Sequence, residues 1–213
     1  MAKLLIMGAS RGVGLETVKA ALSSGHEVRA FARSAASIPV RDERLEKFRG
    51  DARNADDVRR ALEGMDAVVQ TLGADPNLRV LFEGTTLFSE ATRILVDAME
   101  RNGPKRLVTV TGFGAGDSRD HLGPLFRMAF TVTLRRVYDD KDVQEQIIKA
   151  SGLDWTIARP GFLRDGRATG LYRALTNPAD WKLGSIRRAD VARFLLDEIE
   201  RPQFLRQTPA LMS

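Results

Sequence analysis

The chain has 213 residues, of which 43% are hydrophobic and 29% charged, so it can form one α/β domain with a substantial core. It has no cysteine and only two histidines, which excludes disulfides, thiolate metal sites and cysteine nucleophiles and argues against a histidine-rich metal site. Its net charge of +5 reflects either an arginine-rich solvated surface or a positive field that attracts anionic ligands, and the absence of a basic block argues against a nucleic-acid partner.

The beginning of the chain predicts a strand, a tight turn and the start of a helix. An apolar run at residues 4–7 ends at Gly8, and Gly12 and Gly14 follow before a helical pattern over residues 15–22. Glycine lacks a Cβ atom, so such a turn can adopt unusual dihedral angles and approach a ligand closely. The first N–H groups of a helix have no partner within the helix, and the helix dipole favours an anion there. We therefore predict a dinucleotide site at this turn; the alternative is a turn with a structural role only.

Residues 26–33 form the second predicted strand, and its outer end discriminates between the two nicotinamide dinucleotides. An NAD-specific site has an acidic residue there, which binds the ribose 2′-hydroxyl. Here Arg33 and Ser34 occupy that end, and no acidic residue occurs between Glu27 and Asp42. Because the charge and the forked donors of arginine suit a 2′-phosphate, we predict a preference for NADP. The alternative is that Arg33 is an exposed arginine without such a role.

The rest of the chain alternates between strands and helices. Near-continuous apolar strands indicate a sheet that is buried on both faces, and their alternation with helices indicates parallel pairing. We predict an α/β fold, a single Rossmann-like domain over residues 1–213 with a doubly wound parallel sheet and helices on both faces. A small C-terminal substrate lobe is expected in the irregular segment at 162–184, and the tail at 203–213 can add an edge strand. Further strands are expected at residues 45–50, 65–71, 106–111 and 153–159, and helices after Asn54, at 85–102, within 121–151 and from Ser185 onward.

Ligands of such sheets bind at the carboxyl ends of the strands, so the loops at these ends are candidate site residues. Asp51 follows the third strand and can either accept a hydrogen bond from an adenine amino group or serve as a turn residue. Gly73 follows the fourth strand, and the glycine-rich loop at 112–118 follows the fifth and suits a substrate loop. Phe126 and Phe130 in the next segment cover the active site, form an interface or pack into the core.

Two later stretches carry a resemblance to a known family. Asp-Lys-Asp-Val-Gln-Glu (residues 140–145) precedes Gly-Leu-Asp-Trp-Thr-Ile-Ala-Arg-Pro-Gly (residues 152–161). With the glycine turn and the repeated βα units, the sequence resembles the atypical short-chain dehydrogenase/reductases. Within them it is similar to the compact NAD(P)-binding proteins of the NmrA-like and biliverdin reductase B/flavin reductase type, over nearly the whole chain. The glycine spacing departs from the G-x-x-G-x-x-G of these compact relatives, and Arg11 occupies the place of the middle glycine.

The resemblance implies a role for each residue of the cofactor site. The glycine turn lines the pyrophosphate, the end of the second strand meets the 2′-phosphate, and the residues after the third and fourth strands flank the adenine and its ribose. The end of the fifth strand approaches the nicotinamide, Lys141 bridges the hydroxyls of the nicotinamide ribose, and the Pro-Gly-Phe sequence after the sixth strand fixes the carboxamide. The implied cofactor-binding residues are Gly8, Ala9, Ser10, Arg11, Gly12, Val13, Gly14, Arg33, Ser34, Asp51, Ala52, Leu72, Gly73, Ala74, Thr111, Gly112, Lys141, Pro160, Gly161 and Phe162.

The catalytic centre of this family pairs a tyrosine with a lysine four residues later, so that the ammonium group lowers the pKa of the phenol. In this chain Lys141 is followed by Glu145, as the family's lysine often is, but Val137 stands at the tyrosine position. Tyr138 lies three residues before the lysine, still a neighbour on a helix but directed about 100° away. The usual serine after the fifth strand is also absent, and Thr111 is the nearest hydroxyl. Lys141, Tyr138 and Thr111 are therefore the candidate catalytic residues.

The missing tyrosine bears on the reaction. A reductase can work chiefly by holding the nicotinamide against an acceptor while water supplies the proton. We therefore predict an NADPH-dependent oxidoreductase that transfers a hydride to a small planar or conjugated acceptor, such as a flavin, a quinone or a tetrapyrrole-like molecule. The alternatives are a non-catalytic NADP(H)-sensing regulator of the NmrA type and a sugar-nucleotide epimerase or dehydratase.

The expected partners are a small-molecule substrate and NADPH, without a metal, a nucleic acid or a membrane. No apolar run approaches the ~20 residues of a membrane span. Lys3 is followed directly by a core strand, which is unlike a signal peptide. We therefore expect a cytoplasmic protein, either a monomer or a homodimer.

Overall fold

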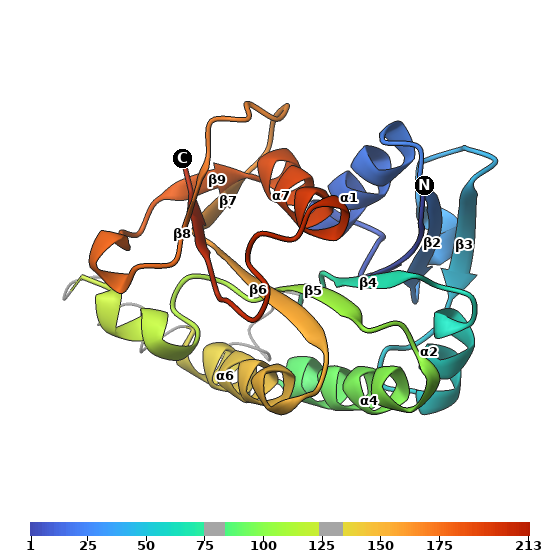
Figure 1. Ribbon diagram of the computed structural model, residues 1–213, viewed down its shortest axis with the longest axis horizontal. Helices are drawn as coiled ribbons and strands as arrows, with labels where there is room; N and C mark the ends of the chain where they lie inside the picture. Colours follow the sequence, from blue (N-terminus) through green and yellow to red (C-terminus); the bar gives the residue numbers. More distant parts are fainter. Residues whose placement is uncertain (75–83, 124–133) are drawn as a thin grey trace.

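Six parallel strands form the centre of the sheet in the order β3-β2-β1-β4-β5-β6, and β10 and β8 extend it beyond β6 (Figure 1). The computed structural model describes residues 1–74, 84–123 and 134–213. β10 pairs in parallel with β6, whereas β8 at the edge runs antiparallel to β10. The strands of this sheet are β1 (Lys3–Met7), β2 (Glu27–Ala32), β3 (Leu45–Arg49), β4 (Ala67–Gln70), β5 (Arg106–Val110), β6 (Asp154–Pro160), β8 (Arg173–Leu175) and β10 (Ala210–Met212).

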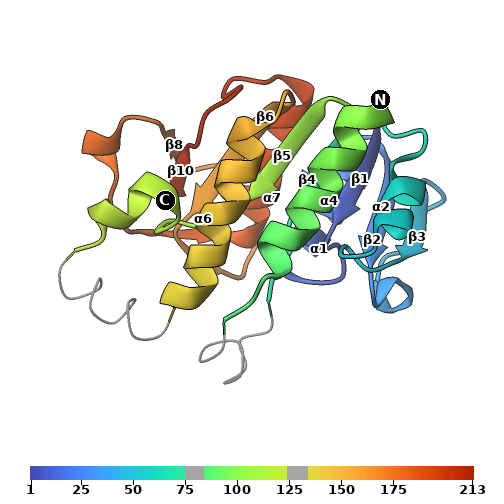
Figure 2. The same ribbon diagram turned by 90° about the horizontal axis from the view of Figure 1, so that it is seen from below.

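Helices cover both faces of the sheet, as the sequence predicts. α1 and α7 lie side by side on one face, and α2, α4 and α6 lie on the other (Figures 1 and 2). A second, two-stranded parallel sheet consists of β7 (Phe162–Arg164) and β9 (Ser185–Arg187). The helices are α1 (Gly12–Ser23), α2 (Ala55–Leu62), α4 (Leu87–Asn102), α6 (Arg135–Ala150) and α7 (Arg188–Glu200), with short 3₁₀ helices η1 (Ala35–Ser37), η2 (Gly116–His121) and η3 (Pro178–Asp180).

Strand β1 is buried on both faces because alternate side chains enter two different core clusters. Leu4 and Ile6 pack in the cluster under α1 and α7, whereas Leu5 and Met7 pack in the cluster under α2, α4 and α6. All four side chains are fully buried. A strand buried in this way has a continuous apolar run rather than an alternating pattern. The predicted parallel sheet between two helical layers is therefore confirmed.

Two local signals in the sequence mark helix ends correctly. The side chain of Asn54 accepts hydrogen bonds from the backbone N–H groups of Asp56 and Asp57, at 3.0 and 3.1 Å, and so caps α2. Gly25 follows α1 with a φ angle of +85°, a conformation that glycine adopts without steric cost. These two ends are decided by local backbone chemistry, which explains why the sequence alone predicts them.

The C-terminal third contains more regular structure than its sequence pattern predicts. Residues 162–184 are predicted to be irregular, but they contain β7, β8 and η3. Residues 185–187 are predicted to begin the last helix, but they form β9, and the helix begins at Arg188. The predicted edge strand of the tail, β10, lies between β6 and β8 rather than at the edge. Three-residue strands are too short to show a periodic pattern, and their hydrogen-bond partners are distant in sequence, so a local reading misses them.

The segment predicted to be mostly helical at residues 121–151 contains α6 in its described part, and its first residue, His121, ends η2. The helix α6 begins at Arg135, and the chain before Leu122 belongs to η2. Phe126 and Phe130 lie outside the described residues.

Candidate active site

The carboxyl ends of β1, β2, β4, β5 and β6 lie at one edge of the sheet, because these strands are parallel neighbours. From β1 the chain proceeds to β2 and β3 on one side, and it then returns to β4, β5 and β6 on the other. Ligands of doubly wound folds bind where the strand order reverses in this way. The fold therefore brings the predicted cofactor residues from several separate segments to the same edge.

The glycines between β1 and α1 are required by the geometry of the turn. Gly8 and Gly12 have φ angles of +84° and +59°, which side-chain-bearing residues rarely adopt. A Cβ atom on Gly14 would overlap the carbonyl oxygen of Gly8 and lie 2.6 Å from Thr71 Oγ1. Helix α1 begins at Gly12, and its N-cap residue, Arg11, makes no side-chain capping bond. The first N–H groups of α1 are therefore left for a ligand or solvent.

Replacing Gly14 with alanine should lower the free energy of unfolding by about 1–3 kcal/mol, because the new methyl group meets rigid backbone. Urea unfolding followed by tryptophan fluorescence would measure the loss. The matched control is Gly73→Ala, since among the described residues, its chain neighbours aside, no atom lies within 4 Å of a Cβ at Gly73. Equal stability of the two variants would contradict the close approach of α1 to β1.

The end of β2 presents the two residues that the sequence assigns to a 2′-phosphate. Arg33 and Ser34 follow Ala32 directly and are both exposed. Their exposure leaves both side chains accessible to a ligand at this edge. The 2′-phosphate contact itself stays a prediction.

The carboxylate of Asp51 is bonded within its own turn. Its Oδ1 accepts a hydrogen bond from the backbone N–H of Arg53 at 3.0 Å, and its own N–H donates to Asp57 Oδ2 at 3.0 Å. The geometry supports the turn role that the sequence left open, and the adenine contact stays a prediction. Ala52 beside it is buried, whereas Leu72, Gly73 and Ala74, in the loop that follows β4, are half-buried or exposed.

The connection from β6 to the C-terminal lobe is tightly packed. A Cβ atom on Gly161 would overlap the carbonyl oxygen of Gly184, so only glycine fits there. Pro160 precedes it and accepts a hydrogen bond from the Phe113 N–H at 2.9 Å. Phe162 follows with half of its side chain exposed. The predicted Pro-Gly-Phe site residues therefore lie where β6 passes into β7.

The ammonium group of Lys141 lies in a buried position beyond the end of β5. Its Nζ donates to the Thr111 carbonyl at 2.6 Å and lies 4.3 Å from the centre of the Phe88 ring. Burial lowers the pKa of Lys141 to about 8, although Glu145 and Asp140 favour the charged form. The side chain is therefore mostly protonated at neutral pH and titrates just above it. A group with these properties suits the binding of ligand hydroxyls and the relay of a proton.

Tyr138 lies against the same turn, although it stands three and not four residues before Lys141. A Cβ atom on Gly112 would lie 2.7 Å from Tyr138 Oη, and Lys141 Nζ is 5.8 Å from the centre of the Tyr138 ring. Burial raises the pKa of Tyr138 to about 12, so the phenol stays protonated at neutral pH. The structure therefore brings Tyr138, Lys141 and Gly112 together, but without the lowered tyrosine pKa of the resembled family.

The hydroxyl of Thr111 belongs to a buried charged network that the sequence analysis missed. It donates to Glu145 Oε1 at 2.9 Å, and the same carboxylate accepts two bonds from Arg159, at 2.9 and 2.5 Å. Arg159 is fully buried, and its Nη1 lies 2.6 Å from Asp117 Oδ1. Thr111 therefore turns its hydroxyl toward Glu145 and its carbonyl toward Lys141. Charged partners on an expected helix and an expected strand carry no local signal of pairing, so only the fold reveals this network.

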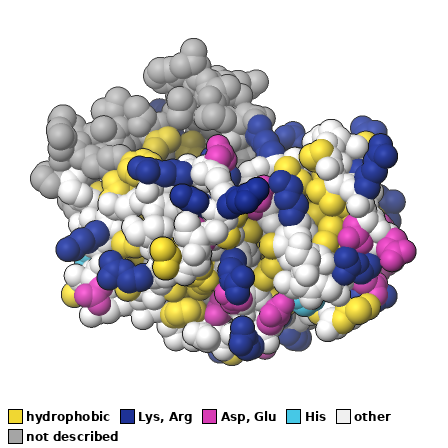
Figure 3. All heavy atoms as spheres, turned by 90° about the horizontal axis from the view of Figure 1, so that it is seen from above, with side chains coloured by type: hydrophobic (Ala, Val, Ile, Leu, Met, Phe, Trp, Pro, Cys, Tyr) yellow, Lys and Arg dark blue, Asp and Glu magenta, His cyan; other side chains and the backbone are white. Residues whose placement is uncertain are grey.

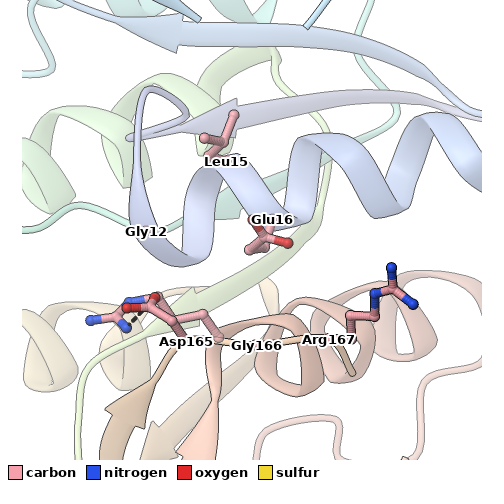
Figure 4. Close-up of a pocket in the computed structure, with 7 residues that line it drawn as sticks. Gly12, Leu15, Glu16, Asp165, Gly166 and Arg167 are labelled. Atoms are coloured by element: carbon pink, nitrogen blue, oxygen red, sulfur yellow. Dashed lines mark hydrogen bonds and ion pairs between the residues drawn. The ribbon is translucent and has the colours of Figure 1, made fainter. Parts of the chain in front are cut away.

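A cavity of about 480 Å³ opens beside the glycine turn (Figure 4). The first turns of α1 form one wall, and residues 165–167 of the C-terminal lobe lie opposite. Arg188, the first residue of α7, also lines the cavity, and its Nη1 donates to Asp165 Oδ1 at 2.7 Å. Asp165 and Arg188 were not predicted from the sequence as site residues; the available signal was the adjacent pair Arg187 and Arg188 at the start of the last helix. The lining residues are Gly12, Leu15, Glu16, Asp165, Gly166, Arg167 and Arg188.

Basic side chains are spread over the face that carries α1 and α7, with acidic side chains between them (Figure 3). On this face the basic side chains are therefore distributed rather than gathered into one block. Within residues 1–74, 84–123 and 134–213, no group of three or more histidine or acidic side chains is arranged to hold a metal ion.

This geometry agrees with a comparison against known families. Residues 8–202 match the family described as NAD(P)H-binding. The chain belongs to this family. The structural neighbours are consistent with the predicted resemblance to the atypical short-chain dehydrogenase/reductases. The matched segment begins at Gly8 and includes the glycine turn, the Lys141 helix and the start of α7.

Individual relatives resemble this chain over most of its length. It is 30% identical over 213 residues to the uncharacterized protein YwnB of Bacillus subtilis, which covers 94% of this chain and 93% of YwnB. The chain is 28% identical to ChuY, an anaerobillin reductase of Escherichia coli O157:H7 whose structure has been solved, with a TM-score of 0.79. The match covers 99% of this chain and 96% of ChuY. The chain is also 30% identical over 172 residues to sterol demethylase protein B of Methylococcus capsulatus, which covers 75% of this chain but spans only 51% of that protein.

In the part of the chain that the structure describes, no helix combines the length and the apolar character needed to cross a membrane.

Proposed function

We propose that this protein is an NADPH-dependent oxidoreductase that transfers a hydride to a small planar or conjugated acceptor, such as a flavin, a quinone or a tetrapyrrole-like molecule. The observation that carries the proposal is the convergence on one sheet edge of the glycine turn, the exposed Arg33 and the Tyr138–Lys141 pair. Membership in the NAD(P)H-binding family supports the dinucleotide. The similarity to ChuY, an anaerobillin reductase, supports a conjugated acceptor.

The residues of this edge fit a dinucleotide. Gly14 allows the start of α1 to approach β1 so closely that its N–H groups can bind a pyrophosphate. Arg33 and Ser34 are accessible to a 2′-phosphate, and Lys141 can donate to ribose hydroxyls. Bound NADPH supplies the hydride from its nicotinamide ring.

Side chains beyond β5 would orient the reactants and provide the proton. The Thr111 carbonyl fixes the ammonium group of Lys141, so that this charge is held where it can bind ribose hydroxyls. Tyr138 retains its proton at neutral pH, because burial raises its pKa to about 12, and its Oη can donate that proton to the acceptor. A conjugated acceptor delocalises the charge that it gains, so it needs less help from an acid than a simple carbonyl does. An unactivated tyrosine therefore suits a conjugated acceptor better.

Purified protein mixed with NADPH and, in turn, a flavin, a quinone and a linear tetrapyrrole tests this proposal. We expect NADPH oxidation with at least one of the three acceptors. Tight NADPH binding without turnover of any acceptor would instead support a nucleotide-sensing regulator. Conversion of a sugar nucleotide without net consumption of NADPH would support an epimerase or dehydratase.

Replacing Tyr138 with phenylalanine should lower kcat by about 100-fold and leave the Kd for NADPH unchanged, because only the proton donor is removed. Steady-state kinetics and calorimetric titration would measure the two quantities. The matched control is Tyr172→Phe, the only other tyrosine of the chain, whose ring packs edge-on against Phe194. Unchanged turnover in the Tyr138 variant would exclude Tyr138 from the mechanism and leave water as the proton donor.

A further inference from the structure

The two helices on the α1 face begin beside each other with arginines at their starts. Arg11 is the N-cap of α1, Arg187 is the N-cap of α7, and Arg188 is the first residue of α7. A Cβ atom on Gly12 would lie 3.9 Å from Arg188 Nε, so the guanidinium group of α7 reaches the glycine turn of α1. Cations at helix N-termini are unfavourable, because the helix dipole is positive there. An anion bound between the N-termini of α1 and α7 would make the arginines at these positions favourable.

The chain opposite α1 is held firmly at the start of α7. Asp190 is fully buried and accepts hydrogen bonds from the N–H groups of Thr169 and Gly170, both at 2.8 Å. Arg187 Nη1 donates to the Arg167 carbonyl at 2.8 Å. The wall formed by residues 165–167 is therefore fixed beside Arg188 by bonds other than the Asp165–Arg188 pair.

The guanidinium group of Arg188 is paired with the carboxylate of Asp165, a side chain of the same protein that is almost fully exposed. Arg188 is 29% exposed, whereas the side chain of Asp165 is 93% exposed. The 2.7 Å bond between them has the geometry by which arginine also binds phosphate oxygens. Glu16 lines the same cavity, but its carboxylate is paired with Lys19 at 2.8 Å. An exposed ion pair of this kind contributes little to stability, so a bound phosphate can replace Asp165 at low cost.

We propose that Arg188 binds the diphosphate group of the dinucleotide from the α7 side of the cavity, and that Asp165 competes for the same guanidinium. This inference rests on the proposed function, because it adds the first residue of α7 to the same cofactor site. The diphosphate is shared by NADPH and NADH, so Arg188 acts on both nucleotides alike, whereas Arg33 acts on the 2′-phosphate alone.

Calorimetric titration of Arg188→Gln and Asp165→Asn with NADPH, NADH and adenosine 2′-monophosphate tests the inference. Arg188→Gln should weaken NADPH and NADH by the same factor, about 10- to 100-fold, and leave the 2′-monophosphate unchanged. Asp165→Asn should tighten NADPH and NADH by about twofold to fivefold, because the competing carboxylate is removed. The two substitutions break one ion pair and yet shift affinity in opposite directions, which a merely structural pair would not do.

The matched control is Arg193→Gln, which removes the same charge from α7 at an exposed position where Arg193 lies 3.9 Å from Asp197. We expect its affinities to equal those of the unsubstituted protein. Unchanged NADH binding in Arg188→Gln, or an equal loss of affinity in Asp165→Asn, would overturn the role of Arg188 and leave the proposed function intact. If the unsubstituted protein binds neither NADPH nor NADH, the proposed function itself fails.

Discussion

Replacing Arg33 with alanine should weaken NADPH binding by about 10- to 100-fold and leave NADH binding unchanged. A charge-assisted hydrogen bond to a phosphate contributes about 1.5–3 kcal/mol to binding. NADH has no 2′-phosphate and cannot form this bond with Arg33, so its affinity should not change. Arg33 is exposed directly after β2, and the nearest carboxylates in sequence, Glu27 and Asp42, are remote from this strand end in the chain. Calorimetric titration with both nucleotides would measure the effect.

The matched control is Arg93→Ala, an exposed arginine on α4, on the opposite face of the sheet from α1. Its loss changes the net charge by the same amount without changing the end of β2, so both nucleotides should bind as before. Equal losses of NADPH and NADH affinity in Arg33→Ala would refute the assignment of Arg33 to the 2′-phosphate. The opposite behaviour is expected of Arg188→Gln, so the two variants separate the two phosphate groups.

Replacing Arg159 with methionine should lower the free energy of unfolding at neutral pH by about 3–5 kcal/mol. The substitution leaves the Glu145 carboxylate buried without its main partner, and a buried charge without a partner is costly. Lys149 Nζ, at 3.2 Å from Glu145, compensates only in part because it lies nearer the surface. Urea unfolding would measure the loss, with the exposed Arg193→Met as a control that stays within about 0.5 kcal/mol.

The pH dependence of this loss follows from Glu145. Burial alone would raise the pKa of Glu145, but the hydrogen bonds and charge of Arg159 outweigh it and hold the pKa below its ordinary value. The stabilisation by the pair is therefore present above the ordinary carboxyl pKa and is lost as the pH falls through the lowered pKa. We expect the difference between Arg159→Met and the unsubstituted protein to shrink in acid. Adding Glu145→Gln to Arg159→Met should recover most of the free energy of unfolding at neutral pH. An equal loss of this free energy in the single and the double variant would contradict this account.

The Arg159 network also explains why candidate catalytic residues could be predicted from the sequence but their mutual arrangement could not. Lys141 was identified by its motif, and the structure places it beside Tyr138 and Gly112. Thr111 is predicted only as the hydroxyl nearest the site, but its Oγ1 donates a hydrogen bond to Glu145, and this arrangement depends on Arg159 from β6. The direction of the Tyr138 hydroxyl likewise depends on how α6 packs against β5, which a spacing of three residues does not determine.

The sequence by itself determined the features that arise from a few neighbouring residues. The glycine turn, the Asn54 cap and the buried strands are governed by local backbone sterics, capping bonds and apolar runs, and the structure confirms all three. Only the tertiary structure decided how distant segments meet. It placed the start of α7 beside the start of α1, so that Arg188 faces the cavity at Gly12, and it paired the short strands β7, β8, β9 and β10. Such contacts depend on hydrogen bonds and charges between residues far apart in the chain, and no local pattern encodes them.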